Sequence, residues 1–408
     1  MLQKLISKNI FIIAISLFVL SAFLGLLIRW NFVFPSQLIS YKNFVQGHSH
    51  VAFLGWGYLA VIGAILKFFI SNENRSKPIY KTTLLIIILS VFLMLFSFPI
   101  SGYKVLSIVL LTVFGITSYV LSFNLLSDLN GGNTSNKLLR FGIYYYLLSS
   151  LATWFLVFVI IKIGKSDLYY NTIYFYLHFL YNGFFVFALF GLLFKVFENQ
   201  QILISEKYKK LFFIYLNVAC IPAYFLSILW SSNSSVFYIF GFAAAFLQLI
   251  SLLFLFKILQ QVFLTLKWNV LSKVLLKFLI IAYSLKVLSQ FLSAFPYVVQ
   301  KSLALKPFFI IGYLHLFTLA FMSVFIILIL SMIGKIFMEN TISKIGISTF
   351  LCGIILTEFL LFGEGFLILI KLKPISNYNL WLLACSGILF LGIFLVFITQ
   401  LLKPKIVI

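Results

Sequence analysis

Seven titratable side chains lie inside long apolar runs of this sequence, where a charge or an unpaired proton is costly. They are His48, His50, His178, Lys286, His315, Glu358 and Glu364, a set that holds all four histidines of the chain. Ionisable groups in apolar segments are rare and mark functional sites by default. Imidazole and carboxylate groups in this setting indicate metal binding, redox chemistry or proton transfer.

The elements that must position these side chains are membrane-spanning helices. The chain is 63% apolar and 9% charged, whereas a soluble domain has about 25% charged residues. A helix exposed to lipid needs about 20 apolar residues to cross the bilayer. The sequence therefore predicts an all-α polytopic transmembrane bundle, with 1–408 as a single domain and the lipid bilayer as its main partner. About twelve spans are expected near residues 9–29, 46–70, 82–101, 105–124, 140–163, 172–195, 210–231, 235–257, 274–297, 308–334, 346–370 and 379–402.

The distribution of Lys and Arg predicts the orientation of these spans. With the N-terminus and the C-terminus on one side, that side holds twenty of the 30 basic residues and the other side nine. Because cytoplasmic loops are enriched in Lys and Arg, both termini are expected in the cytoplasm. The net charge of +22 does not indicate nucleic-acid binding, because the basic residues form no continuous patch. The first apolar run is too long for a signal peptide and is expected to remain as the first span.

This topology places the four histidines at one depth. All four lie in spans that run inward from the outer face, within the first few turns of each span. At a rise of 1.5 Å per residue, they fall roughly 5–12 Å below the outer surface. Histidines on facing helices at a matched depth can clamp a haem or hold a metal ion. The alternative for any one of them is a hydrogen bond to a neighbouring helix, without a cofactor.

His48 and His50 cannot both face one iron, because two residues span about 200° on a helix. We favour His50 as the ligand, since it lies deeper and the small residues after it could let a flat macrocycle approach the backbone. His48 would then serve a second site or cap the helix in the interfacial region.

Lys286, Glu358 and Glu364 suggest proton movement or structural support. Lys286 and Glu358 are both expected near the middle of the membrane, where they could form a proton or ion relay or an interhelical pair that fixes packing. Glu364 lies in the layer of the histidines. It could orient a ligand imidazole or reach to the outer interface.

The placement of the histidines in the second, sixth and tenth spans resembles the catalytic subunit of haem–copper oxidases and nitric oxide reductases. Residues 47–56 (GHSHVAFLGW) look like the ligand region of the second span in that family, and residues 313–316 (YLHL) look like a reduced form of the ligand region in the tenth span. The resemblance implies that His50 and His315 hold haem b, and that His178, with His48 as a further candidate, belongs to a second metal position for copper or iron.

The sequence also departs from the family pattern. The seventh span has no histidine, the tenth has only His315, and Asn182 stands where the oxidases have a tyrosine. A complete binuclear centre cannot be assembled from histidine. The resemblance therefore implies electron transfer or binding of NO or O₂ rather than full oxygen reduction. It extends in outline to the NnrS-type haem- and copper-containing membrane proteins, and it implies residence in the inner (cytoplasmic) membrane.

Two other functions stay open from the sequence. A proton- or ion-coupled transporter is suggested by Lys286 and Glu358 at mid-membrane and by Pro222 within the seventh span. A non-catalytic scaffold that contacts a redox partner or other membrane subunits is the third hypothesis. If the chain is an enzyme, the sequence favours a respiratory-type oxidoreductase.

Overall fold

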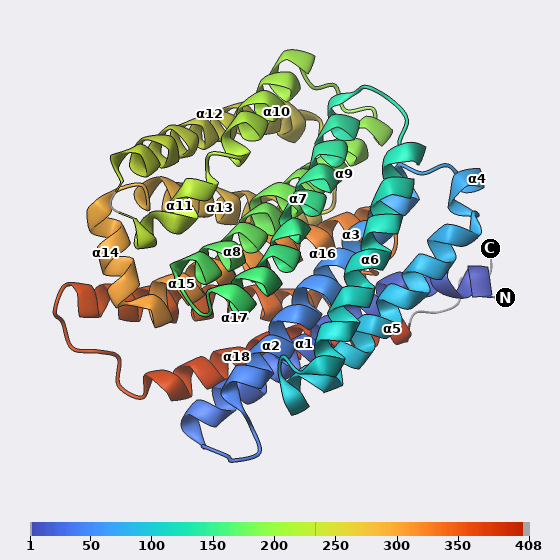
Figure 1. The fold of residues 1–408 in the computed structure, drawn as a ribbon. Coiled ribbons are helices and arrows are strands. Elements are labelled where there is room, and N and C mark those ends of the chain that lie inside the picture. Colours follow the sequence, from blue (N-terminus) through green and yellow to red (C-terminus); the bar gives the residue numbers. More distant parts are fainter. Residues whose placement is uncertain (1, 233, 403–408) are drawn as a thin grey trace. The chain divides into compact units, whose positions relative to one another are not determined.

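The computed structural model describes residues 2–232 and 234–402, which form helices joined by short connections and contain no strand (Figure 1). Eleven helices in the described part of the chain are long and apolar enough to cross a membrane. The chain is therefore a polytopic transmembrane helical bundle, as the sequence predicts. Lys403 and Lys405, two of the basic residues used to predict the orientation, lie outside the described residues.

The expected number of spans differs from this count by one helix. The span predicted at 274–297 corresponds to α13 (Val270–Leu292), which is not among the eleven. Its 23 residues include Lys273, Lys277 and Lys286, and these lysines lower its apolar character. The twelfth span stays a prediction.

The chain divides into two compact units. The first joins the chain up to Asp128 with the chain from Ile326 onward, and the second is Leu129–Phe325. The helices of the first unit are α1 (Leu2–Val33), α2 (Tyr41–His50), η1 (Val51–Tyr58), α3 (Leu59–Phe68), α4 (Asn72–Arg75), α5 (Pro78–Ser101), α6 (Val105–Asp128), α17 (Thr341–Leu369) and α18 (Tyr378–Leu401).

In the first unit, α1 packs against α18 and also against α2, η1 and α3. Phe18 and Trp56 stack between α1 and η1, with ring centroids 4.7 Å apart. The helices α5 and α6 pair as a hairpin whose ends are joined by a polar cluster. There Asp128 accepts hydrogen bonds from Lys77 Nζ at 2.6 Å and from the Tyr80 hydroxyl at 2.8 Å.

The second unit contains the middle of the chain. Its helices are α7 (Thr134–Lys162), α8 (Asp167–His178), η2 (Phe179–Phe185), α9 (Val186–Asn199), α10 (Glu206–Cys220), α11 (Tyr224–Ile228), η3 (Leu229–Ser231), α12 (Ser235–Thr265), α13, α14 (Pro296–Ala304), α15 (Lys306–His315) and η4 (Leu316–Ser323). The helix α16 (Val324–Met332) continues from η4 and begins at the end of this unit.

Close approach of the backbones and aromatic packing hold the second unit together. A Cβ atom added to Gly183 would lie 2.4 Å from Tyr145 Cβ, so η2 and α7 meet where only glycine fits. The Phe190 ring of α9 contacts the rings of Tyr283 on α13 and Phe321 on η4, with centroids 5.0 and 6.0 Å away. These contacts place α13, η4 and α9 around a shared aromatic core.

Three of the eleven spans are more enclosed than the rest. Between 72% and 89% of the most apolar stretch is buried in Tyr41–Phe68, Asp167–Asn199 and Lys306–Met332, against 33–50% in the other eight. All four histidines lie in these three spans. The spans that carry the candidate ligands are therefore those most shielded from lipid.

The α17–α18 hairpin provides a test of the packing. A Cβ atom at Gly392 would lie 2.5 Å from Phe350 N, whereas one at Gly387 on the same helix meets no atom within 4 Å. We expect Gly392→Ala to destabilise the protein by about 1–3 kcal/mol, because overpacking must push the helices apart. The thermal unfolding midpoint of the purified protein in detergent measures the change.

Gly387→Ala is the matched control. It should leave the midpoint unchanged or raise it slightly, because alanine favours a helix over glycine by up to about 1 kcal/mol. Equal midpoints for the two variants would contradict the close contact between α17 and α18.

Candidate functional site

Three of the four histidines occupy the same kind of position in three separate spans. His50 is the last residue of α2, His178 of α8 and His315 of α15, and in each case a π-helical segment begins at the next residue. These π segments are η1, η2 and η4. A π segment is a wider turn than the α-helix, is rare, and occurs often at functional sites. The shared junction distinguishes these histidines from residues that merely face a helix interface.

Local side chains accompany two of the wider turns. Asn182 within η2 donates from its side-chain nitrogen to His178 Nδ1, 3.2 Å away. Ser323 at the end of η4 donates its hydroxyl to the carbonyl of Thr318, five residues earlier, at 2.7 Å. A hydroxyl that bonds back along the chain competes with regular helical bonding.

His48 and His50 point to different neighbours, as their spacing predicts. His48 Nδ1 lies 2.8 Å from the carbonyl oxygen of Ser21 on α1. The His50 ring stacks on Phe98 of α5, with centroids 4.4 Å apart. Its Nε2 lies 3.2 Å from the hydroxyl of Tyr103, in the connection after α5. The two imidazoles therefore serve two different helix contacts.

The hydrogen bonds of His48 and His50 decide which nitrogen carries the lone pair. His50 Nδ1 lies 2.8 Å from the carbonyl oxygen of Gln46, and a carbonyl can only accept, so Nδ1 carries the proton. The same argument holds for His48 Nδ1 against Ser21 O. In both rings Nε2 is left as the lone-pair nitrogen. Metal-binding histidines usually have this arrangement, with the other ring N–H donated to a carbonyl or carboxylate.

These donors fit a haem iron or a metal ion, but the glycine after His50 does not open a space for a macrocycle. A Cβ atom at Gly55 would lie 3.0 Å from Val91 and 3.1 Å from Leu17, so neighbouring side chains already fill that face. The partner of His50 Nε2 is the hydroxyl of Tyr103, which is an exposed residue. A ligand of His50 would therefore replace the Tyr103 hydroxyl, and would not lie against Gly55.

His178 has both ring nitrogens in hydrogen bonds. Its Nε2 donates to the carbonyl of Cys220 at 2.8 Å, and its Nδ1 accepts from Asn182. The side chain is only 2% exposed. A metal ion at His178 would require the Asn182 amide to move away from Nδ1.

The carbonyl of Cys220 is available because the backbone changes its bonding at Pro222. The helix α10 ends at Cys220, and Tyr224 N donates to the carbonyl of Ile221, 3.1 Å away, instead of to Cys220. Proline lacks an N–H and disrupts the helix around it. In a bilayer every such carbonyl needs a partner inside the protein, and His178 supplies it. This arrangement favours a structural role for His178.

Lys286 lies in the same unit as His178 and is also buried. Its side chain is 2% exposed, and Nζ lies 5.6 Å from the centre of the Tyr283 ring. In the part of the chain that the structure describes, no ion pair includes Lys286. The structure thus places Lys286 and His178, two of the residues singled out in the sequence, in the same unit.

His315 lies in the second unit beside the segment of His178. The Tyr181 ring of η2 stacks on the Phe317 ring of η4, with centroids 5.0 Å apart and planes 19° from parallel. Because these aromatic residues follow His178 and His315 within three positions, the two α–π junctions are neighbours. The His315 side chain is half-buried.

The two glutamates of α17 have different surroundings. Glu364 accepts a hydrogen bond from the backbone N–H of Ile375 at 2.8 Å, which fixes the connection between α17 and α18. This contact anchors Glu364 to the connection, and both roles raised by the sequence stay predictions. Both carboxylate oxygens of Glu358 are buried, and neither has a hydrogen-bond partner within the described residues.

The sequence did not single out the polar pair beside the break in α10. The Tyr145 hydroxyl donates to Asn217 Oδ1 at 2.9 Å, linking α7 to the last turn of α10. The sequence signal was the position of Asn217, five residues before Pro222 in an otherwise apolar helix. A polar side chain near a proline inside a span often compensates for lost backbone bonding.

Within residues 2–232 and 234–402, no group of three or more His, Cys, Asp and Glu side chains is arranged to hold a metal ion. Haem needs only one or two protein ligands, so this finding bears on metal sites made by the protein alone. No protein-family model matches the chain, and no curated protein sequence matches it significantly.

The hydrogen bond of His178 leads to a prediction about stability. We expect His178→Ala to cost about 1–3 kcal/mol, because it leaves the Cys220 carbonyl buried without a partner. The unfolding midpoint in detergent measures this loss.

The second arm of the experiment uses Pro222→Ala. Alanine lets α10 continue as a regular helix. The Tyr224 N–H can then donate to the Cys220 carbonyl in place of His178. His178→Ala should therefore cost less in the Pro222→Ala background than in the native chain. An equal cost in both backgrounds would show that His178 does not act through this carbonyl.

Proposed function

We propose that the chain is an integral membrane haem- or metal-binding protein, similar in outline to subunit I of the haem–copper oxidases. Its activity would be electron transfer or binding of NO or O₂. The observation that carries the proposal is the α–π junction at His50, His178 and His315, in the three most enclosed spans. Because π segments are rare and occur often at functional sites, their position beside these histidines supports a ligand role for His50 and His315.

The proposed haem ligands are His50 and His315, and the cofactor is haem b. His48 and His178 are the proposed ligands of a second metal, copper or iron. A bound haem iron would supply one-electron redox chemistry and a position for a diatomic gas.

The chain's own groups support the ligand role of His50. The Gln46 carbonyl fixes the proton on Nδ1 and makes Nε2 the more basic nitrogen. The stacked Phe98 ring holds the imidazole plane. The Tyr103 hydroxyl, which is now the partner of Nε2, is placed to donate a hydrogen bond beside the ligand position.

The proposal places the protein in the inner (cytoplasmic) membrane of a cell, with both termini in the cytoplasm. Its partners would be a redox protein or other membrane subunits. If it turns over a substrate, it would be a respiratory-type oxidoreductase. Support for this location is the Lys and Arg distribution between the two sides.

An absorption spectrum of the purified protein tests the proposal. From haem-replete cells the protein should show a Soret band, and His50→Ala or His315→Ala should abolish it by removing an axial ligand. The haem content per folded protein is measured alongside the spectrum.

The control is His178→Ala, which removes a buried histidine that is not a proposed haem ligand and should keep the band. A colourless native protein, or equal loss of haem in all three variants, would count against the proposal. Copper and iron analysis of the same samples tests the second metal.

A second candidate function is proton- or ion-coupled transport, and the surroundings of Lys286 favour it. The buried amide oxygens of Gln248, Gln290 and Asn182 have no hydrogen-bond partner in the described part of the chain. Gln290 lies one turn after Lys286 and on the same face of α13. The helices α12 and α13 pair antiparallel, with the ring centroids of Phe242 and Phe291 5.5 Å apart. This pairing places Gln248 near the level of Lys286. Buried cations with unpaired acceptors line ion and proton pathways in membranes.

Flux measurements in proteoliposomes test this second function. If Lys286 carries or gates a proton or ion, Lys286→Met should abolish the flux that the native protein supports, because methionine keeps the length of the side chain without the charge. Lys137→Met, at an exposed lysine of α7, is the matched control and should retain the flux. Native protein without flux, or equal flux in both variants, would exclude transport through Lys286.

A further inference from the structure

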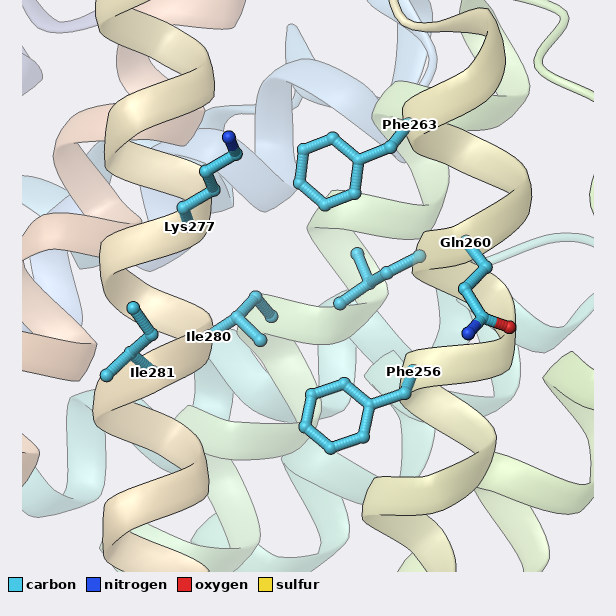
Figure 2. A pocket seen from close by; sticks show the side chains of 7 residues that line it. Phe256, Gln260, Phe263, Lys277, Ile280 and Ile281 are labelled. Atoms are coloured by element: carbon cyan, nitrogen blue, oxygen red, sulfur yellow. The ribbon is translucent and has the colours of Figure 1, made fainter.

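A groove of about 580 Å³ runs between α12 and α13 in the second unit (Figure 2). It is formed by residues of these two helices alone, and most of them are apolar. The labelled lining residues are Phe256, Gln260, Phe263, Lys277, Ile280 and Ile281. None of them belongs to the histidine-bearing segments.

The groove carries its one charged side chain, Lys277, at one end and is mostly apolar toward the other, with Gln260 between Phe263 and Phe256 on α12. Figure 2 shows Lys277 and Phe263 facing each other across the end nearer the α12–α13 connection, with Lys277 Nζ 6.0 Å from the centre of the Phe263 ring. Ile280 and Phe256 lie on the two helices further from the connection, with Ile280 pointing into the groove. This gradient is the one that a lipid presents, with a polar headgroup above an apolar chain.

The connection between the two helices carries a residue that is typical of a membrane interface. It contains Trp268, whose indole N–H donates to Gln200 Oε1 at 2.8 Å. Tryptophan is enriched where the hydrocarbon meets the headgroups. Lys277 is the eighth residue of α13, so its Cα atom lies about 10–12 Å along the axis from the start of the helix. A lysine at this depth extends its stem toward the interface, as its position over Phe263 indicates.

The charge around the connection is mainly positive, and the acidic side chains of the neighbouring segment, Glu198 and Glu206, are already paired with Lys195 and Lys209. Lys267, Lys273 and Lys277 lie within 11 residues, Lys257 lies on α12 at the level of Phe256, and the sequence has no Asp or Glu from 207 to 338. In the described part of the chain, no ion pair includes any of these four lysines. Basic pockets between transmembrane helices bind anionic lipid headgroups, each nearby lysine contributing about 1 kcal/mol.

We propose that the α12–α13 groove binds one anionic phospholipid, with an acyl chain along Phe256, Ile280 and Ile281 and its phosphate at Lys277 and the lysines of the connection. The uncompensated positive charge at one end selects an anionic headgroup over a zwitterionic one. The apolar remainder requires an acyl chain, so a free phosphate compound would bind poorly. The site is independent of the proposed haem and metal ligands.

Native mass spectrometry of the full chain in detergent tests the site, with phosphatidylglycerol and phosphatidylcholine of identical acyl chains as probes. The native protein should retain one phosphatidylglycerol molecule more tightly than any phosphatidylcholine. Lys277→Gln should weaken phosphatidylglycerol binding about fivefold and leave phosphatidylcholine unchanged. Because Lys277 is exposed and in no ion pair of the described chain, this variant should fold normally.

Two further variants and a competitor complete the experiment. Lys207→Gln, at an exposed lysine outside the groove, should bind phosphatidylglycerol as the native protein does. Ile281→Trp should reduce binding by filling the apolar end. The proposal is overturned if phosphatidylglycerol binds no better than phosphatidylcholine, or if Lys277→Gln behaves as Lys207→Gln. It is also overturned if soluble glycerol phosphate displaces the lipid at equal concentration, since that would indicate a phosphate site without a chain.

Discussion

Every backbone N–H and C=O group inside a bilayer must find a partner within the protein, because hydrocarbon offers none. The whole fold depends on this constraint. Regular helices satisfy it along their length, so the departures from regularity show where side chains must take over. The clearest departure is the end of α10, where the Cys220 carbonyl loses its backbone partner near Pro222 and gains the imidazole of His178.

The π segments are a second departure, and they explain why histidines matter in this bundle. Each begins directly after a histidine at the end of an α-helical segment. A wider turn changes the direction of the side chains on either side of it, so a residue at the junction faces a different neighbour than a straight helix would give it. His50 meets Phe98 and Tyr103, and His178 meets Cys220. The same geometry therefore serves a candidate ligand in one unit and a structural hydrogen bond in the other.

Charge in a low-dielectric medium is the third constraint, and α13 resolves it in two ways. Lys277 is exposed along the groove and reaches toward the end of the helix, whereas Lys286, nine residues later, is enclosed against Tyr283. A buried ammonium group bears the full free-energy cost of desolvation unless nearby groups accept hydrogen bonds from it. The buried amide oxygens of Gln248 and Gln290 accept no hydrogen bond within the described residues, and they lie near the level of Lys286 on the α12–α13 pair. One helix thus carries a lysine suited to a lipid headgroup and another suited to a buried pathway.

The sequence alone determined the class of the fold, because an apolar content of 63% with 9% charge leaves lipid as the solvent and helices as the elements. It also located the titratable residues within the spans, and it predicted opposite directions for His48 and His50 from the helical repeat. Only the tertiary structure decided what each side chain bonds to. The partner of His178 is a carbonyl 42 residues away, and that of Glu364 is a backbone N–H beyond the end of its own helix. The π segments were invisible in the sequence, because they arise from how a helix packs against its neighbours and leave no periodicity of their own.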